Sequence, residues 1–289
     1  MLLFEFWAGN SPAFVVFALL LGLMLGSFIN VVAHRLPLML ERDWKAQSRD
    51  VLGLPPEEPG PRFDLLLPAS RCPHCGHAIR AWENIPLLSY ALLRGKCSAC
   101  KARISPRYPL VELACGLLSA WVAWHFGVGW QVVAALAFTW ALLAATLIDI
   151  DHQLLPDAIV LPLLWLGLMV NAFGLFVPLA DALWGAVAGY SILWMVFWAF
   201  KLLTGKDGMG YGDFKLLATF GAWGGWHILP LTLLLSSLVG AVAGLIILRV
   251  RNVSTSTAIP FGPYLAVAGW IALLWGDEIT TSYLHFAGF

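Results

Sequence analysis

Long apolar runs constrain this chain more than any other feature of its sequence. About 20 apolar residues are needed for a helix to cross the hydrocarbon core of a bilayer. Runs of this kind predict eight membrane helices, near residues 12–34, 108–126, 130–149, 158–177, 181–201, 213–228, 229–248 and 258–275. Because 60% of the 289 residues are hydrophobic, which is outside the soluble range, the sequence predicts an all-α polytopic membrane protein.

Two places in this pattern need a separate argument. The first run is predicted to be a membrane helix rather than a signal peptide, because the flank before it is acidic and it lacks a cleavage pattern of small residues. The sixth and seventh runs are nearly continuous. Gly224, Gly225 and Pro230 favour a turn between them.

Basic residues orient the predicted bundle, because Lys and Arg near helix ends stay on the cytoplasmic side. Twelve of the seventeen lie between Arg35 and Arg107. The other five are Lys201, Lys206, Lys215, Arg249 and Arg251. An arrangement of eight helices with the N-terminus outside places each of these five at a cytoplasmic helix end, so we expect both termini outside the cytoplasm.

The chain is predicted to have three parts. Residues 1–37 hold an outside N-terminal segment and the first membrane helix, residues 38–107 form a polar cytoplasmic insert, and residues 108–289 form a membrane domain of seven helices. The insert opens with residues 41–64, which are rich in Pro, Gly and charges. Such a composition predicts a loop-rich stretch.

Four cysteines in the insert form two C-x2-C pairs, Cys72 with Cys75 and Cys97 with Cys100. Thiolates at this spacing can converge on one tetrahedral zinc ion. Two disulfides are the alternative, but the basic residues place the insert in the cytoplasm, where persistent disulfides are rare. The sequence therefore predicts a structural Zn2+ that holds together an insert with little core of its own.

Two aspartates at the predicted membrane boundary are candidates for chemistry, because an ionisable group at that depth is costly. Asp149 ends the third run and Asp213 begins the sixth, so both lie at cytoplasmic helix ends and could face each other. Two such carboxylates can share one proton, one acting as a base on water and the other as an acid. Asp213 could instead cap its helix, and spacing alone does not choose between Asp149 and Asp151. Asp157 is predicted to cap the fourth helix.

Three glycines precede the second aspartate, at Gly208, Gly210 and Gly212. Glycine permits positive φ and close backbone approach, so we expect a bent or extended loop that could lie against a bound peptide. The Gly-x-Gly-x-Gly spacing is not assigned to a nucleotide, because no βαβ unit precedes it.

Other functional classes fit the sequence less well. It has no H-E-x-x-H motif of zinc proteases and no G-x-S-x-G motif of serine hydrolases. A transporter or channel would carry polar residues along its helices, whereas these runs are apolar apart from Asn30 and Asn171. A non-enzymatic assembly scaffold would leave the Asp213 loop without a purpose. No basic surface for nucleic acid is indicated.

Several motifs taken together point to one known family. They are Gly26-Ser-Phe-Ile-Asn30 with Arg35-Leu-Pro37, the paired C-x2-C motifs, Glu83-Asn-Ile-Pro86, ISPRYPLVE, LIDIDHQLLPD, GMGYGDFKLL and IPFGPYLA. With these motifs the chain resembles, over nearly its whole length, the bacterial type IV prepilin leader peptidases, which are intramembrane aspartyl proteases of the G-x-G-D class. It is close to the pseudomonad members of that family.

The resemblance implies that Asp149 and Asp213 are the catalytic pair and that Gly210 and Gly212 belong to the active-site loop. It implies substrates of two kinds, type IV prepilins and type II secretion pseudopilins, cut at the cytoplasmic face after the glycine that ends a short basic leader. The enzyme would be a multi-pass protein of the bacterial inner membrane, in contact with lipid, with periplasmic termini.

The resemblance also implies a second activity, N-methylation of the new N-terminal residue with S-adenosylmethionine as the methyl donor. This activity is associated with the cytoplasmic insert, and Glu83 and Asn84 are our candidates for the site that binds the methyl donor. The sequence carries no independent methyl-donor motif and no signal for an oligomeric state.

Overall fold

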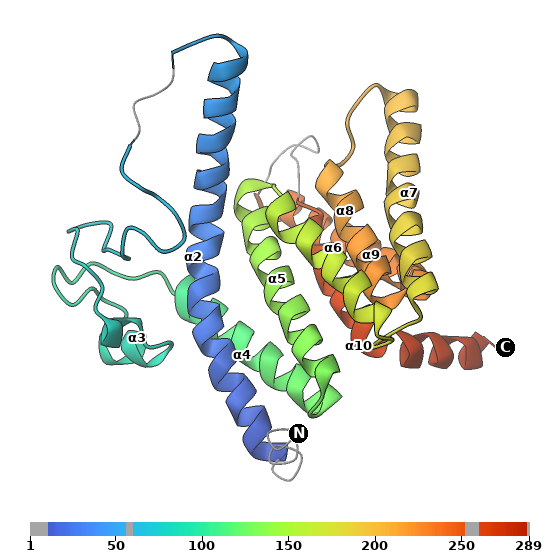
Figure 1. The fold of residues 1–289 in the computed structure, drawn as a ribbon, viewed down its shortest axis with the longest axis horizontal. Helices are drawn as coiled ribbons and strands as arrows, with labels where there is room; N and C mark the ends of the chain where they lie inside the picture. The colour runs from blue at the N-terminus through green and yellow to red at the C-terminus, as the bar shows by residue number, and fades with distance from the viewer. Residues whose placement is uncertain (1–10, 56–59, 252–259, 288–289) are drawn as a thin grey trace. The chain divides into compact units, whose positions relative to one another are not determined.

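The computed structural model describes residues 11–55, 60–251 and 260–287, and the chain forms two compact units, residues 1–132 and 133–289 (Figure 1). The helices, in chain order, are α2 (Ser11–Val51), η1 (Ala81–Asn84), α3 (Leu88–Leu92), α4 (Arg107–Phe126), α5 (Trp130–His152), α6 (Asp157–Ala172), α7 (Leu179–Thr204), α8 (Tyr211–Gly224), η2 (Trp226–Ile228), α9 (Leu229–Arg251) and α10 (Gly262–Ala287). The described residues contain two isolated β-bridges and no strand, so the predicted all-α class is confirmed.

The long helices follow the apolar runs. Eight helices of 14 residues or more occur among the described residues, one for each predicted run. Five segments are long and apolar enough to cross a membrane: α2, α4, α5, α7 and residues Trp226–Ile246, which comprise η2 and most of α9. The structure and the sequence therefore agree on a polytopic membrane protein.

Helix α8 lies at the centre of the second unit and packs against α6, α7 and α10. Its contact with α7 is close, because Gly221 lies directly against the backbone of Gly185. One turn away, a Cβ added to Gly189 would lie 2.6 Å from the carbonyl oxygen of Leu217. Small residues of this kind let two helix backbones approach each other in a membrane protein.

Buried polar side chains fix the C-terminal end of α8. Asn171 donates from Nδ2 to the carbonyl oxygens of Ala222 and Trp223, both at 2.9 Å. Trp223 donates from Nε1 to the carbonyl oxygen of Leu163, also at 2.9 Å. The carbonyls that receive the Asn171 bonds lie at a helix end, where intrahelical donors are missing. Asn171, isolated in an apolar run of the sequence, thus has a structural role.

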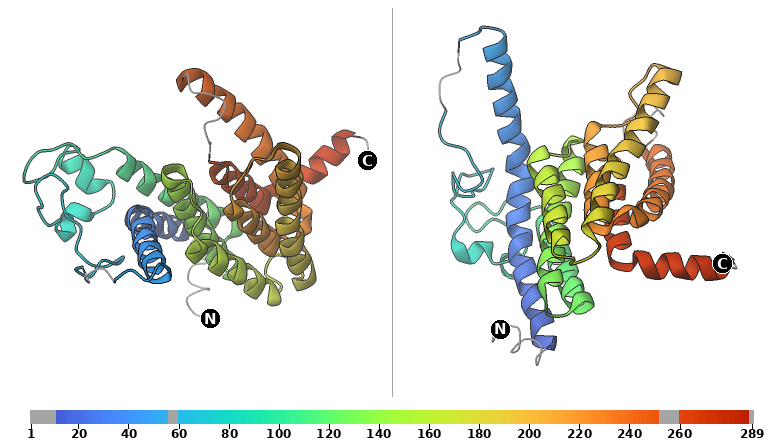
Figure 2. Two further views of the ribbon diagram at one scale, coloured as in Figure 1. Left: turned by 90° about the horizontal axis from the view of Figure 1, so that it is seen from above. Right: turned by 45° about the vertical axis from the view of Figure 1, so that its right-hand side comes forward.

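Helix α10 changes direction at Trp275, where φ is −132° and ψ is 16°. The predicted eighth run ended at this residue, but the helix continues to Ala287 (Figure 2). The sequence prediction missed this part because Asp277 and Glu278 interrupt the apolar run. Local helix formation does not require the continuous apolarity by which membrane runs are counted.

In the first unit, α2 packs along α4 through small residues. A Cβ on Gly26 would lie 2.7 Å from the Cα atom of Glu112, and one on Gly116 would lie 2.8 Å from the Leu23 side chain. The short side chains therefore set the helix separation, as they do for α7 and α8.

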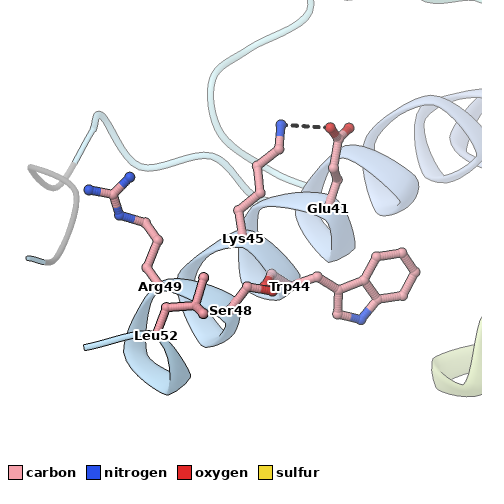
Figure 3. Close-up of a pocket in the computed structure, with 6 residues that line it drawn as sticks. All are labelled: Glu41, Trp44, Lys45, Ser48, Arg49 and Leu52. Atoms are coloured by element: carbon pink, nitrogen blue, oxygen red, sulfur yellow. Dashed lines mark hydrogen bonds and ion pairs between the residues drawn. The ribbon is translucent and has the colours of Figure 1, made fainter. Parts of the chain in front are cut away.

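The prediction that the insert opens as a loop-rich stretch is wrong for its first residues. Helix α2 continues through Pro37 to Val51. Within it, Lys45 forms an ion pair with Glu41 one turn earlier, at 2.6 Å (Figure 3). Proline removes only one helical hydrogen bond, and pairs at i and i+4 support a helix, so the segment stays helical. Gly53, with φ of +64°, lies two residues after its end.

Candidate active site and metal centre

The two aspartates come from different helices of the second unit. Asp149 lies in the last turn of α5, and Asp213 lies in the first turn of α8. They are 5% and 6% exposed, and they are close enough for their charges to interact. Asp149 also lies at the end of its helix where the macrodipole disfavours a negative charge. Placing two buried carboxylates near each other does not stabilise the fold, so a chemical role is indicated for them.

Burial separates Asp149 from its neighbour in the sequence. Asp151 is exposed, whereas Asp149 is buried. Within the described residues, no group forms a hydrogen bond with Oδ2 of Asp149. A buried carboxylate oxygen without a hydrogen-bond partner is costly, so its presence points to a functional role.

Asp213 does not cap its helix. The residue at the cap of α8 is Gly210, and no side chain makes the capping hydrogen bond. The N–H of Asp213 donates to the carbonyl oxygen of Gly210 at 3.2 Å. Asp213 is therefore not the cap residue of α8, although its carboxylate lies beside the backbone of Gly210, which is.

The three glycines of the loop differ in what surrounds them. Cβ atoms at Gly208 and Gly212 would lie 2.8 Å from the Phe200 ring and from Cβ of Leu155, so both positions need glycine for packing. At Gly210 the nearest atom would be Oδ2 of Asp213, 3.8 Å away. None of the three has the positive φ that glycine permits. Glycine therefore allows close packing at positions 208 and 212, and leaves open space beside the Asp213 carboxylate at position 210.

Gly262, at the start of α10, also belongs to the site. A Cβ there would lie 2.5 Å from Oδ2 of Asp149 and 3.2 Å from the Leu155 side chain. Only glycine lets α10 begin so close to the carboxylate. The sequence argument did not single out this residue, and the one available signal was its place in the motif IPFGPYLA.

An ion pair ties the start of α8 to the start of α6. Lys215 donates from Nζ to both carboxylate oxygens of Asp157, at 2.7 and 2.8 Å. The prediction that Asp157 caps α6 is wrong, because Pro156 occupies the cap and no side chain caps it. Asp157 pairs with Lys215 of another helix instead.

The four cysteines lie together in two knuckles of the same shape. In the first, the N–H of Gly76 donates to the carbonyl oxygen of Cys72 at 2.9 Å; in the second, the N–H of Lys101 donates to that of Cys97 at 3.1 Å. Both Gly76 and Lys101 have positive φ. Each knuckle is closed by an isolated bridge, Arg71 with Ala78 and Lys96 with Arg103.

This arrangement fits a tetrahedral metal ion. All four Sγ atoms lie within 4.8 Å of one another, and Cys72 and Cys100 are separated by 3.8 Å. Metal–sulfur bonds of about 2.3 Å in a tetrahedron give sulfur–sulfur distances of about 3.8 Å. Backbone N–H groups of His74 and Cys75 lower the pKa of the Cys72 thiol to about 7, which favours the thiolate that binds metal, whereas burial and the neighbouring thiols raise the pKa of Cys75 to about 11. A metal ion would therefore have to displace the proton of Cys75.

Glu83 links the two knuckles rather than facing outward. Its side chain is 5% exposed, and Oε2 accepts from the N–H of Arg80 at 2.8 Å and lies 3.2 Å from Nε2 of His77. Ser98 of the second knuckle contacts the same ring nitrogen at 3.3 Å. Hydrogen bonds lower the pKa of Glu83 to about 2; the bond from the Arg80 N–H has the largest effect, and those of Ser98 and His77 have smaller ones. Asn84, the neighbouring candidate, is exposed.

Two family models match the chain. One, described as the bacterial peptidase A24 N-terminal domain, matches residues 20–126, and one described as the type IV leader peptidase family matches residues 136–245. The prepilin leader peptidase/N-methyltransferase of Stutzerimonas stutzeri is 69% identical over 283 residues, which is 98% of either chain. The chain belongs to the prepilin leader peptidase/N-methyltransferase family.

Other members of the prepilin leader peptidase/N-methyltransferase family are similar over the same length. That of Pseudomonas aeruginosa is 67% identical over 287 residues and that of Aeromonas hydrophila is 57% identical over 286 residues. These matches cover 99% and 98% of each chain. No solved structure matches the chain. The resemblance inferred from the motifs is thus confirmed, including its closeness to pseudomonad members.

Proposed function

We propose that this chain is a membrane aspartyl endopeptidase in which Asp149 and Asp213 remove the short basic leader from type IV prepilins and type II secretion pseudopilins. The observation that carries the proposal is that these two buried carboxylates, from α5 and α8, lie near enough to interact electrostatically, beside an open position at Gly210. A water molecule between them and a peptide bond lying along the glycine loop would complete the reacting set.

The chemistry requires the two carboxyl groups to hold different protonation states. One carboxylate takes a proton from water as the oxygen attacks the peptide carbonyl, and the other, protonated, donates to the carbonyl oxygen or the leaving amine. Two neighbouring carboxylates cannot easily both carry a negative charge, so the pair can hold one proton between them. No covalent intermediate is needed.

The active site faces the cytoplasm in this proposal. Lys201, Lys206 and Lys215 lie near the same helix ends as the two aspartates, and basic residues are retained on the cytoplasmic side. The substrate's basic leader would stay in the cytoplasm while its apolar helix remains in the lipid. The chain would then be a protein of the bacterial inner membrane with both termini in the periplasm.

The insert would hold a structural Zn2+ through Cys72, Cys75, Cys97 and Cys100, since four thiolates leave no open coordination position. The second activity would be N-methylation of the cleaved product, for which S-adenosylmethionine supplies an electrophilic methyl group. Glu83 and Asn84 remain our candidates for its binding. The contacts of Glu83 suit it to hold the segment in shape, and the exposed amide of Asn84 would be offered to the donor.

The proposal is tested by cleavage of a purified prepilin in detergent. Asp149→Asn and Asp213→Asn should each lose at least about 10³-fold in rate, because either acid or base chemistry is then missing. Asp151→Asn is the matched control, two residues away but exposed, and should cleave at close to the parent rate. Metal content and thermal unfolding of each variant report whether it is folded.

A normal rate in either of the first two variants would show that the substituted aspartate is an interfacial carboxylate without a catalytic role. Loss of cleavage in Asp151→Asn together with retention in Asp149→Asn would move the catalytic role to Asp151.

A further inference from the structure

A groove with a volume of about 580 Å³ opens in the second unit between α7, α9 and the start of α10. Its lining includes Val196 of α7, Ala241 of α9 and Tyr264 of α10. Helix α7 packs on α8, whereas α9 packs on α10, so the groove lies between two separate helix pairs. None of the described residues that line it is charged.

The α9 wall of the groove carries small side chains. After Leu233, the residues of α9 that line the groove are Ser237, Gly240 and Ala241, one helical turn apart or less. A Cβ added to Gly240 would lie 3.4 Å from the Tyr264 ring and 3.8 Å from the Phe261 ring, so these two rings lie beneath the glycine. Small residues on a membrane helix allow another helix to approach closely.

One end of the groove reaches the catalytic loop. Gly208 and Met209, which directly precede the open position at Gly210, line it. So does Phe261, whose neighbour Gly262 lies against the carboxylate of Asp149. A chain lying in the apolar groove would therefore lead to the loop that precedes Asp213 and to the residue beside Asp149.

We propose that this groove seats the apolar helix that follows the scissile bond of the substrate. The inference rests on the proposed function and adds the surface that selects the substrate. The groove is apolar, one wall admits close helix packing, and it is continuous with the loop beside the carboxylates. Val196, 50% exposed, lies at an open side from which a membrane-embedded helix can enter.

The test compares two substrates, a full prepilin and a short peptide that ends a few residues after the scissile bond. In the parent enzyme the prepilin should have the higher kcat/KM, because binding energy from its helix is used in the reaction. Ala241→Phe fills the groove and should lower the ratio of kcat/KM for prepilin to kcat/KM for peptide by about tenfold. Val242→Phe, the next residue on α9, is exposed and does not line the groove, and should keep the parent ratio.

The outcomes separate the two proposals. If the parent enzyme cleaves neither substrate, the proposed function itself fails. If Ala241→Phe keeps the parent ratio, the groove does not hold the substrate helix, although the enzyme is a peptidase. A lowered ratio in Ala241→Phe alone supports the groove, and an equal loss in Val242→Phe overturns it.

A second measurement covers the case in which Ala241→Phe does not fold. A photo-reactive benzoylphenylalanine at position 241 of the Asp213→Asn enzyme should cross-link to the helix of a bound prepilin, and the same group at position 242 should cross-link to lipid. Cross-linking to lipid alone at both positions would make the groove a lipid site and overturn the inference.

Discussion

The cysteine-containing insert and the helices around α8 are stabilised in different ways. Between residues 60 and 106 only Ser89, Gly95 and Cys97 are buried, whereas eleven of the fourteen residues of α8 are buried. Apolar burial can therefore hold α8 and its aspartate in place but cannot hold the insert. We therefore expect the insert to depend on a metal ion at its four cysteines, and the position of the two aspartates to depend on close helix packing. The two regions should respond to different perturbations.

The largest effect is expected where α7 and α8 touch. Gly221→Val places a branched side chain against the backbone of Gly185 and should destabilise the second unit by about 3 kcal/mol or more, with loss of cleavage. Gly129→Val is the control, since nothing lies within 4 Å of a Cβ there. Thermal unfolding in detergent measures the difference. Equal midpoints for the two variants would show that the close contact is not needed.

The next effect concerns the metal. Cys72→Ser should release the ion and expose the insert to proteolysis, because binding free energy of a structural zinc is folding free energy. Cys115→Ala removes a buried cysteine outside the cluster and should leave metal content unchanged. Elemental analysis and limited proteolysis are the measurements. A full equivalent of metal in Cys72→Ser would rule out the four-thiolate site.

A smaller effect is expected in the glycine loop, where one position has room and another has none. Gly210→Ala should fold like the parent but lower cleavage by about tenfold, because the methyl group occupies space meant for the substrate. Gly212→Ala should instead lower the unfolding temperature, because its Cβ meets Leu155. Rates and unfolding curves of both variants separate binding space from packing. A parent rate in Gly210→Ala would show that the space is unused.

The smallest effect should come from Glu83. Glu83→Ala loses the acceptor for the Arg80 N–H and should weaken metal retention by about tenfold. Glu83→Gln keeps an oxygen there and should lose less. Since the folded-state pKa is lowered from 4.5 to about 2, the charged Glu83 stabilises the insert above about pH 4.5 and this stabilisation is lost as pH falls toward 2. Competition with a chelator at neutral pH measures metal retention in each variant. Retention equal to the parent's in Glu83→Ala would contradict the prediction.

Much of this architecture could be predicted from sequence because membrane insertion imposes a simple length rule. Each of the eight apolar runs has its helix, and the cysteine spacing led to a cluster of four thiols. The helical continuation of α2 to Val51 could not be read this way, because a polar helix outside the membrane has no apolar run.

The finer features of the site depend on tertiary contacts that spacing does not reveal. Asp149 and Asp151 are equivalent in the sequence, and only packing buries one and exposes the other. The place of Gly262 against Asp149 depends on where α10 begins relative to α5. The contacts of Glu83 depend on two knuckles that fold toward each other.

The most direct test of the account measures both activities in two variants, Asp213→Asn and Cys72→Ser. The account predicts that Asp213→Asn stops cleaving prepilin but methylates an already cleaved pilin within about threefold of the parent rate. It predicts that Cys72→Ser, without metal, cleaves within about threefold of the parent rate but retains less than about a tenth of the methyl transfer. If both activities fall together in either variant, the two regions do not carry separate chemistries and the account is wrong.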